Sequence, residues 1–171
     1  KRQVGCHAQR CLPVKLWRIA AETRKYPAAD LSGGGAAAFP GRWNDEKQAV
    51  IYSAPSIAIA VLETAAHIDD TGLPLNRFLV EIDVPDDVWT QHEVATLSSL
   101  PPAWCAIPAG GASVKVGSAW LTSRRSPILL VPSVIVPEEY AALINPHHPA
   151  STKITAKAVS YTHLRAHETS L

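Results

Sequence analysis

Residues 49–67 read AVIYSAPSIAIAVLETAAH and carry the clearest structural pattern in the sequence. Its first five residues are mostly apolar and include adjacent β-branched side chains, which is typical of a buried strand. We expect a helix to follow, capped by Ser53 or Ala54 and extending to about His67, because Pro55 is tolerated in a first helical turn. The stretch therefore predicts a strand that leads directly into a helix.

The expected helix places a carboxylate among apolar side chains. Residues 57–62 are apolar on nearly every side, so the helix is expected to be buried on most of its surface. Glu63 and His67 are four residues apart and share one face with Ser56 and Ala60. Because a buried carboxylate is costly without a partner or a function, Glu63 is the first candidate for chemistry.

On either side of this stretch, shorter apolar segments predict the rest of the fold. We expect strands at residues 15–19, 77–84 and 127–132, extended chain over 133–137, a glycine-rich loop over 31–44, a helix over 113–123 and a turn cluster over 145–149. In the strand over 77–84, the side chains expected to face a core are those of Phe78, Val80, Ile82 and Val84. In the helix over 113–123, they are those of Val116, Ala119 and Trp120. Strands mixed with helices and long loops predict an α+β fold.

The composition fits one globular domain of 171 residues and argues against several classes of protein. The net charge is +1 with no basic stripe, so the chain is not expected to bind nucleic acid. No apolar run is long enough to span a membrane and no apolar signal core follows the basic N-terminus, so the expected location is the cytoplasm. Three cysteines do not indicate a disulfide framework, and Cys6, His7 and Cys11 lack the second ligand pair of a zinc site, so no metal is expected.

Common nucleotide and hydrolase motifs are missing from the sequence. Residues 33–35 are consecutive glycines but begin neither a P-loop nor a Gly-x-Gly-x-x-Gly fingerprint, and no Gly-x-Ser-x-Gly occurs. What remains is a set of polar residues at the ends or inside of apolar elements: Arg18, Arg42, Tyr52, Glu63, His67 and Ser133. Taken singly, each fits a structural role such as an ion pair or a loop brace. Taken together, they suit a phosphate-bearing substrate on which positive charge develops.

An ordered set of motifs resembles the RES domain family, which is named for its Arg, Glu and Ser. The set covers about residues 15–155 and comprises LWR at 16–18, GRWN at 41–44, VIYSAPS at 50–56, AVLE at 60–63, His67, GSAWL at 117–121, VPSVIVP at 131–137 and NPHHP at 145–149. Each motif alone is weak, but their order along the chain is specific.

The resemblance implies a fold, an activity and a partner. The fold is similar to that of ADP-ribosyltransferases of the diphtheria-toxin kind, with small mixed or antiparallel sheets and helices. Family members are growth-arresting toxins of toxin–antitoxin pairs, and they use NAD⁺ as a substrate. Their usual partner is an Xre-like antitoxin with a helix-turn-helix domain, whose C-terminal part blocks the active site.

With NAD⁺ as the substrate, each candidate residue receives a role. Glu63 is expected to stabilise the positive charge that grows on the ribose as nicotinamide leaves. Arg18 and Arg42 suit the pyrophosphate, because a guanidinium binds phosphate in a bidentate manner. Tyr52 is expected to stack on nicotinamide or to hold the ribose. Ser133 is expected to hydrogen-bond the ribose or Glu63, and His67 to orient Glu63 or to contact the ligand. We expect catalysis to depend on Glu63, Arg42, Tyr52 and Ser133, and NAD⁺ binding to depend on Arg18, Arg42, Tyr52, His67 and Ser133.

The sequence leaves the acceptor of ADP-ribose open. Transfer to a protein would make the chain a mono-ADP-ribosyltransferase, whereas water or phosphate would make it an NAD⁺ glycohydrolase or phosphorylase. No Glu-x-Glu pair precedes or includes Glu63, which does not decide between them. A third alternative is an inactive module that only binds the antitoxin, and the intact set of candidate residues argues against it.

The expected domain limits leave a short segment outside the domain at each end. Residues 1–14 show no periodicity and are expected to form a loose leader, and the domain is expected to span residues 15–157. The last segment, residues 158–171, departs from the aromatic strand and Asp-Pro-Arg-Leu-like ending of the family and is expected to be a non-native tail. We assign no function to its His163, Arg165 and His167.

Overall fold

Two β-sheets form the frame of the protein in the computed structural model, which describes residues 14–66 and 77–161. The first sheet contains β1 (Val14–Ala21), β3 (Arg77–Val84) and β7 (Thr155–Tyr161), all antiparallel with β3 in the middle. The second sheet has the order β2 (Ile51–Ser53), β6 (Tyr140–Ile144), β5 (Ile128–Pro132) and β4 (Glu93–Val94). Its pairs are antiparallel except for β4 and β5, which are parallel.

The two sheets meet where β1 approaches the end of β2. The backbone N–H of Trp17 donates to the carbonyl of Ala54, and the N–H of Ala54 donates back to the carbonyl of Trp17, both at 2.8 Å. This bridge satisfies backbone groups at the edge of β1 that would otherwise lack a partner in the sheet. It also fixes the position from which the next helix starts.

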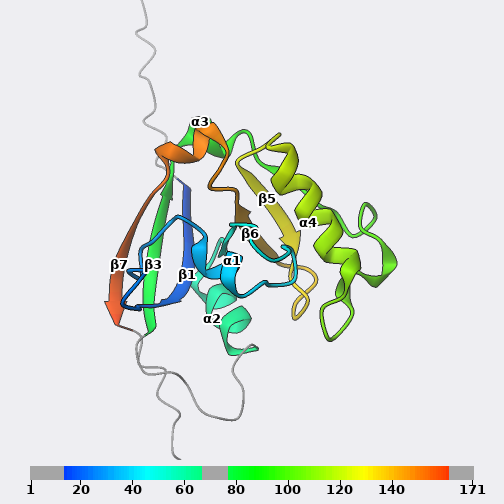
Figure 1. Cartoon of the computed structure of the whole chain (residues 1–171), viewed down its shortest axis with the longest axis horizontal. Coiled ribbons are helices and arrows are strands. Elements are labelled where there is room, and N and C mark those ends of the chain that lie inside the picture. Colours follow the sequence, from blue (N-terminus) through cyan, green and yellow to red (C-terminus); the bar gives the residue numbers. More distant parts are fainter. Residues whose placement is uncertain (1–13, 67–76, 162–171) are drawn as a thin grey trace, which may run out of the picture.

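Two hydrophobic cores lie on opposite faces of the second sheet. The first core fills the space between the sheets, where Leu16, Val80 and Ile82 pack with Ile51 and Ile144. The second core lies on the other face and consists of Trp43, Val50, Ala95, Leu100, Trp104, Trp120, Leu121, Leu129, Val131 and Leu143. The layers are therefore sheet, sheet and helix, as Figure 1 shows from β7 and β3 across β6 and β5 to α4.

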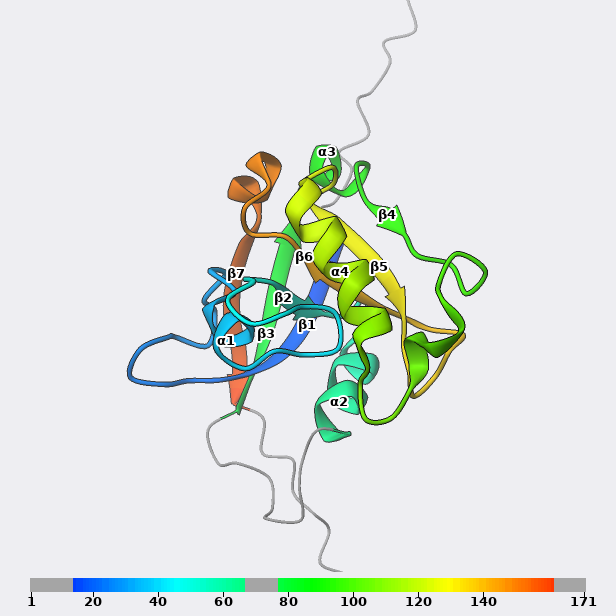
Figure 2. The same ribbon diagram turned by 45° about the vertical axis from the view of Figure 1, so that its right-hand side comes forward.

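The helices lie at the ends and the outer side of the sheets. The α-helices are α1 (Gly34–Ala38), α2 (Ile57–Ala65), α3 (Asp86–Trp89) and α4 (Gly111–Ser123), and the 3-10 helices are η1 (Pro102–Cys105) and η2 (Pro149–Lys153). Figures 1 and 2 place α2 at one end of the first sheet and α3 at the other. Of the helices that the structure describes, none has the length and apolar character needed to cross a lipid bilayer.

The α+β fold class is confirmed, and so are the main expected strands and the second helix. Phe78, Val80, Ile82 and Val84 face the first core as the alternation predicted. Trp120 is buried and Val116 packs on the second core, but the prediction for Ala119 is wrong because its side chain is exposed. Position 119 turns away from the core because Ser113, Gly117, Trp120 and Leu121 form the buried side of the helix.

The expected start of the first helix is wrong, because the capping residue is Ser56 and not Ser53 or Ala54. The helix begins at Ile57, and Ser56 caps it by accepting a hydrogen bond from the Ile59 N–H at 3.2 Å. Ser53 is unavailable because its hydroxyl donates to the carbonyl of Ala142 at 2.8 Å. Ala54 belongs to the bridge with Trp17. Partners distant in the sequence therefore keep both residues out of the helix.

Other segments also differ from the expectations. Residues 133–137 do not continue the strand, because the Ser133 hydroxyl accepts from the N–H groups of Ile135 and Val136 and turns the chain. The glycine-rich loop contains the short helix α1, and β6 was not expected at all. The last strand, β7, ends at Tyr161.

Candidate active site

Glu63 and Ser133 come together where α2 meets the end of β5. The Ser133 hydroxyl donates to Glu63 Oε1 at 2.6 Å. The same hydroxyl oxygen accepts from the backbone N–H groups of Ile135 and Val136, both at 3.1 Å. Because its one proton and both lone pairs are engaged, the Ser133 side chain holds a single orientation. The hydroxyl therefore orients the carboxylate of Glu63 and has no second hydrogen to donate to a ribose.

The position of Glu63 follows from the packing of α2. Ile59 and Ala60 on this helix are buried against Ala54 and the side chain of Trp17. Glu63 itself is only partly buried. The helix therefore presents a partly exposed carboxylate that accepts a hydrogen bond from Ser133, which is an arrangement suited to charge stabilisation on a bound molecule.

Arg42 lies in the loop between α1 and β2 and is anchored to η1. Its Nη1 donates to the carbonyl oxygens of Trp104 at 3.0 Å and Ala106 at 2.8 Å. Neither bond uses Nε or Nη2, which form the edge of the guanidinium that binds phosphate or carboxylate through two parallel hydrogen bonds. Arg42 is thus held by one nitrogen and presents a two-donor edge.

The hydroxyl of Tyr52 holds the same loop. It accepts from the Trp43 N–H at 3.0 Å and donates to Asn44 Oδ1 at 2.8 Å. Burial raises the pKa of Tyr52 to about 12, against the opposing effects of the Trp43 N–H and the positive charge of Arg42. The phenol is therefore neutral at physiological pH, and its donor is committed to Asn44 rather than to a ribose.

Asn44 is the residue of this loop to which the sequence assigned no role. Its side chain is fully buried, and Oδ1 accepts from the Gly41 N–H at 2.9 Å as well as from Tyr52. Its Nδ2 donates to the carbonyls of Ala36 at 2.9 Å, Asp45 at 3.1 Å and Gln48 at 3.1 Å. The signal was a polar residue at the end of Gly-Arg-Trp-Asn, but its partners cannot be identified from spacing alone.

The loop also packs directly on α4. A Cβ added at Gly117 would lie 1.8 Å from the carbonyl oxygen of Trp43, so only glycine allows this approach. On its other side, the Trp43 ring stacks on Trp104 with centroids 6.0 Å apart and planes at 24°. The backbone next to Arg42 is therefore fixed by α4 and by η1.

Arg18 lies beside the first core, whereas the loop of Arg42 packs on the second core. Its register position on β1 matches that of Leu16 and Ala20, which face the space between the sheets. Its Nη1 donates to the carbonyl of Asp30 at 3.1 Å. Burial lowers the pKa of Arg18, and the negative charge of Asp30 opposes this effect. The remaining candidate, His67, lies outside the described residues.

Four of the predicted residues thus form two groups beside the second core, Glu63 with Ser133 and Arg42 with Tyr52. Val134, the neighbour of Ser133, packs on the second core together with Trp43 and Tyr52. The core therefore connects the Glu63–Ser133 pair to the loop of Arg42 through packed side chains, while Arg18 borders the first core.

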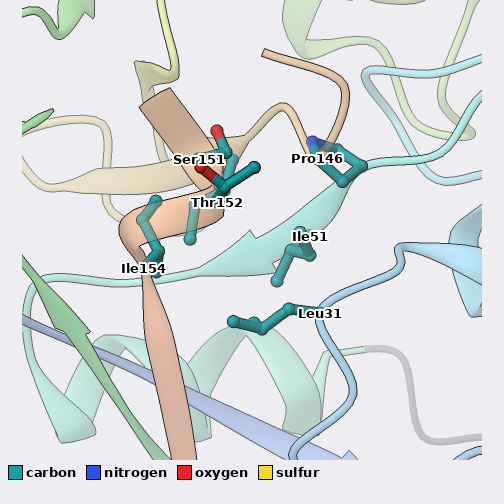
Figure 3. A pocket seen from close by; sticks show the side chains of 7 residues that line it. Leu31, Ile51, Pro146, Ser151, Thr152 and Ile154 are labelled. Atoms are coloured by element: carbon teal, nitrogen blue, oxygen red, sulfur yellow. The ribbon is translucent and has the colours of Figure 1, made fainter. Parts of the chain in front are cut away.

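A half-open cavity of about 250 Å³ lies apart from these residues. Figure 3 shows it between the start of β2, η2 and the chain around Leu31. Its lining consists of Leu31, Ile51, Ile144, Pro146, Ser151, Thr152 and Ile154, and includes none of the predicted site residues. Among the residues that the structure describes, no group of three or more His, Cys, Asp or Glu side chains is placed to hold a metal ion.

Comparison with known proteins identifies the family. The family model described as RES domain matches residues 15–167. A protein of Sphingobium sp. (strain YBL2) named "Prs ADP-ribosylating toxin" is 53% identical over 148 residues, which cover 86% of this chain and 92% of that protein. A "Toxin Res" of Yersinia enterocolitica is 37% identical over 133 residues and covers 78% of this chain and 84% of its own.

A solved structure shares the fold. The toxin–antitoxin complex MbcT–MbcA of M. tuberculosis contains a chain that aligns with a TM-score of 0.64 at 19% identity. The alignment covers 86% of this chain and 85% of that one. At this identity the likeness extends to the fold alone.

Proposed function

The chain belongs to the RES domain family, and we propose that it is a toxin that cleaves the nicotinamide–ribose bond of NAD⁺ and transfers ADP-ribose to a target protein. Nicotinamide leaves NAD⁺ as a neutral molecule, so the reaction needs no acid to protonate the leaving group. It needs a negative charge beside the ribose, where an oxocarbenium-like cation develops.

The observation that carries the proposal is the hydrogen bond from Ser133 to Glu63 Oε1 at 2.6 Å. A charge preorganised in this way stabilises a transition state without reorganising during the reaction. We assign the carboxylate of Glu63 to a hydroxyl of the ribose. In this scheme Ser133 orients Glu63 and does not itself contact the substrate.

The pyrophosphate of NAD⁺ requires cations, and Arg42 suits it best. The Nε and Nη2 edge of its guanidinium is outside the anchoring bonds to η1 and matches two phosphate oxygens. Arg18 is a second candidate for phosphate contact from β1, and His67 for contact near Glu63. Tyr52 can contact the ligand only through its ring, because its hydroxyl is hydrogen-bonded to Trp43 and Asn44.

A protein acceptor is favoured by the name of the Sphingobium relative, "Prs ADP-ribosylating toxin", which is 53% identical to this chain. Prs is therefore the first acceptor to test. We further propose that the protein acts in the cytoplasm and is neutralised by an Xre-like antitoxin. The fold shared with a toxin from a toxin–antitoxin complex supports an antitoxin partner.

The test uses purified wild type, Glu63→Gln and the control Asp86→Asn with labelled NAD⁺, Prs and a cell lysate. Asp86 lies in α3, which Figure 1 places at the far end of the sheets from α2, so its variant removes a carboxylate outside the site. We expect the wild type and Asp86→Asn to label a protein, and Glu63→Gln to lose about 10²-fold or more of the turnover.

Two results would contradict the proposal in different ways. Release of free ADP-ribose or its phosphate with no labelled protein would replace transfer by hydrolysis or phosphorolysis. An undiminished turnover in folded Glu63→Gln would remove the role assigned to the carboxylate.

A further inference from the structure

We propose that Asn44 is a positioning residue for this reaction, which sets the place of the Arg42 guanidinium without touching NAD⁺. The inference rests on the proposed function, because it assigns Asn44 to the binding of the pyrophosphate through Arg42. It concerns a residue that is fully buried and lies two positions after Arg42 in the chain.

The amide of Asn44 has no capacity left for a ligand. An asparagine side chain offers two acceptor positions on Oδ1 and two donor hydrogens on Nδ2. Here Oδ1 accepts from the Gly41 N–H and the Tyr52 hydroxyl, and Nδ2 lies within 3.1 Å of three backbone carbonyls. Any effect of Asn44 on NAD⁺ must therefore pass through the groups that it holds.

Those groups surround Arg42 on both sides along the chain. Gly41 precedes Arg42 and donates to Asn44 directly. Trp43 follows Arg42 and donates to the Tyr52 hydroxyl, which in turn donates to Asn44. The backbone at position 42 is consequently tied to one amide, while the far end of its side chain is tied to the carbonyls of η1.

Loss of the Asn44 amide is expected to move the phosphate-binding edge of Arg42. Gly117 and Trp104 keep the Trp43 side of the loop in place, so the loop as a whole remains folded. The Gly41 side loses its anchor. Misplacement of a binding group by about 1 Å is enough to cost up to 10²-fold in function.

The experiment measures the Kd of NAD⁺ by calorimetry in the Glu63→Gln background, which prevents turnover during the titration. Asn44→Ala is measured with Arg42 intact and again in Arg42→Ala. We expect Asn44→Ala to raise Kd about tenfold with Arg42 present and by less than about twofold in its absence, because coupled residues in one network are not additive.

Tyr52→Phe serves as a second variant if Asn44→Ala fails to fold. It removes only the hydroxyl between Trp43 and Asn44 and keeps the ring. We expect a smaller rise in Kd that also disappears in Arg42→Ala.

The matched control is Asn145→Ala. Asn145 is also fully buried and bonded through both ends of its amide, to the Leu121 carbonyl at 2.9 Å and the His147 N–H at 3.0 Å. We expect this variant to lower the Tm while leaving Kd within about twofold. An equal rise in Kd for Asn145→Ala would attribute the effect to general destabilisation and overturn the inference.

The remaining outcomes separate this inference from the function it rests on. An equal effect of Asn44→Ala with and without Arg42 would show that Asn44 does not act through the guanidinium, even if NAD⁺ binds. A protein that binds no NAD⁺ at millimolar concentration in any of these forms would contradict the proposed function, and this inference would fall with it.

Discussion

Replacing Gly117 by alanine tests the packing that fixes the Arg42 loop. The added methyl would lie 1.8 Å from the Trp43 carbonyl oxygen, 2.7 Å from its carbon and 3.0 Å from its Cα. All three atoms belong to the backbone, so no side-chain rotation relieves the contact. The loop or α4 must shift by more than about 1 Å to reach an ordinary separation.

The expected cost follows from two opposing effects. Overpacking of this kind destabilises by about 1–3 kcal/mol, and the rigid neighbour puts the value near the upper end. Alanine in the middle of a helix returns about 1 kcal/mol relative to glycine. The net loss is about 2 kcal/mol, which for a domain of this size lowers the Tm by about 4–8 °C.

The assay is thermal unfolding followed by circular dichroism, with Gly111→Ala as the matched control. Gly111 begins the same helix, and a Cβ added there meets no atom within 4 Å. The control is expected to unfold at the wild-type temperature or slightly above it. If Gly117→Ala unfolded together with Gly111→Ala, the close approach of Trp43 to α4 would be refuted.

Two further predictions concern charged side chains. Arg42→Lys should raise the Kd of NAD⁺ about tenfold in calorimetry, since lysine cannot form the two parallel bonds of the guanidinium edge. The control Arg124→Lys, at an exposed position, should leave the Kd unchanged. An unchanged Kd for Arg42→Lys would count against the phosphate role. Hydrogen bonds from Lys15 and Lys157 lower the pKa of Glu81 in the folded state, so its ionised form adds stability above the ordinary pKa of 4.5 and loses it as the pH falls through the folded value. The wild type should therefore have a higher Tm than Glu81→Gln at pH 7, with a gap that narrows below pH 4.5, and a gap independent of pH would contradict the ion pairs.

Local patterns predicted the elements but not how they are joined. The alternation over residues 77–84 identified β3 because one face of this strand packs on the first core, and that signal is local. The start of α2 was displaced because the partners of Ser53 and Ala54, which are Ala142 and Trp17, lie far away in the sequence. No local pattern contains such pairings.

The same limit applies to the candidate site. The sequence identified Glu63 and Ser133 as candidates, and the structure joins them by a hydrogen bond. The sequence did not reveal that the hydroxyl of Tyr52 holds the Arg42 loop, or that Asn44 organises this loop. Both facts depend on which backbone groups converge on a buried amide, and that is decided by tertiary packing.

A crystal structure of Glu63→Gln with NAD⁺ bound would show whether Arg42 and position 63 contact the same ligand. We predict that the pyrophosphate lies on the Nε and Nη2 edge of Arg42 and the nicotinamide ribose beside the side chain at position 63, with the Arg42 bonds to Trp104 and Ala106 retained. NAD⁺ seated instead in the cavity between Leu31 and Thr152, touching neither Arg42 nor position 63, would contradict it.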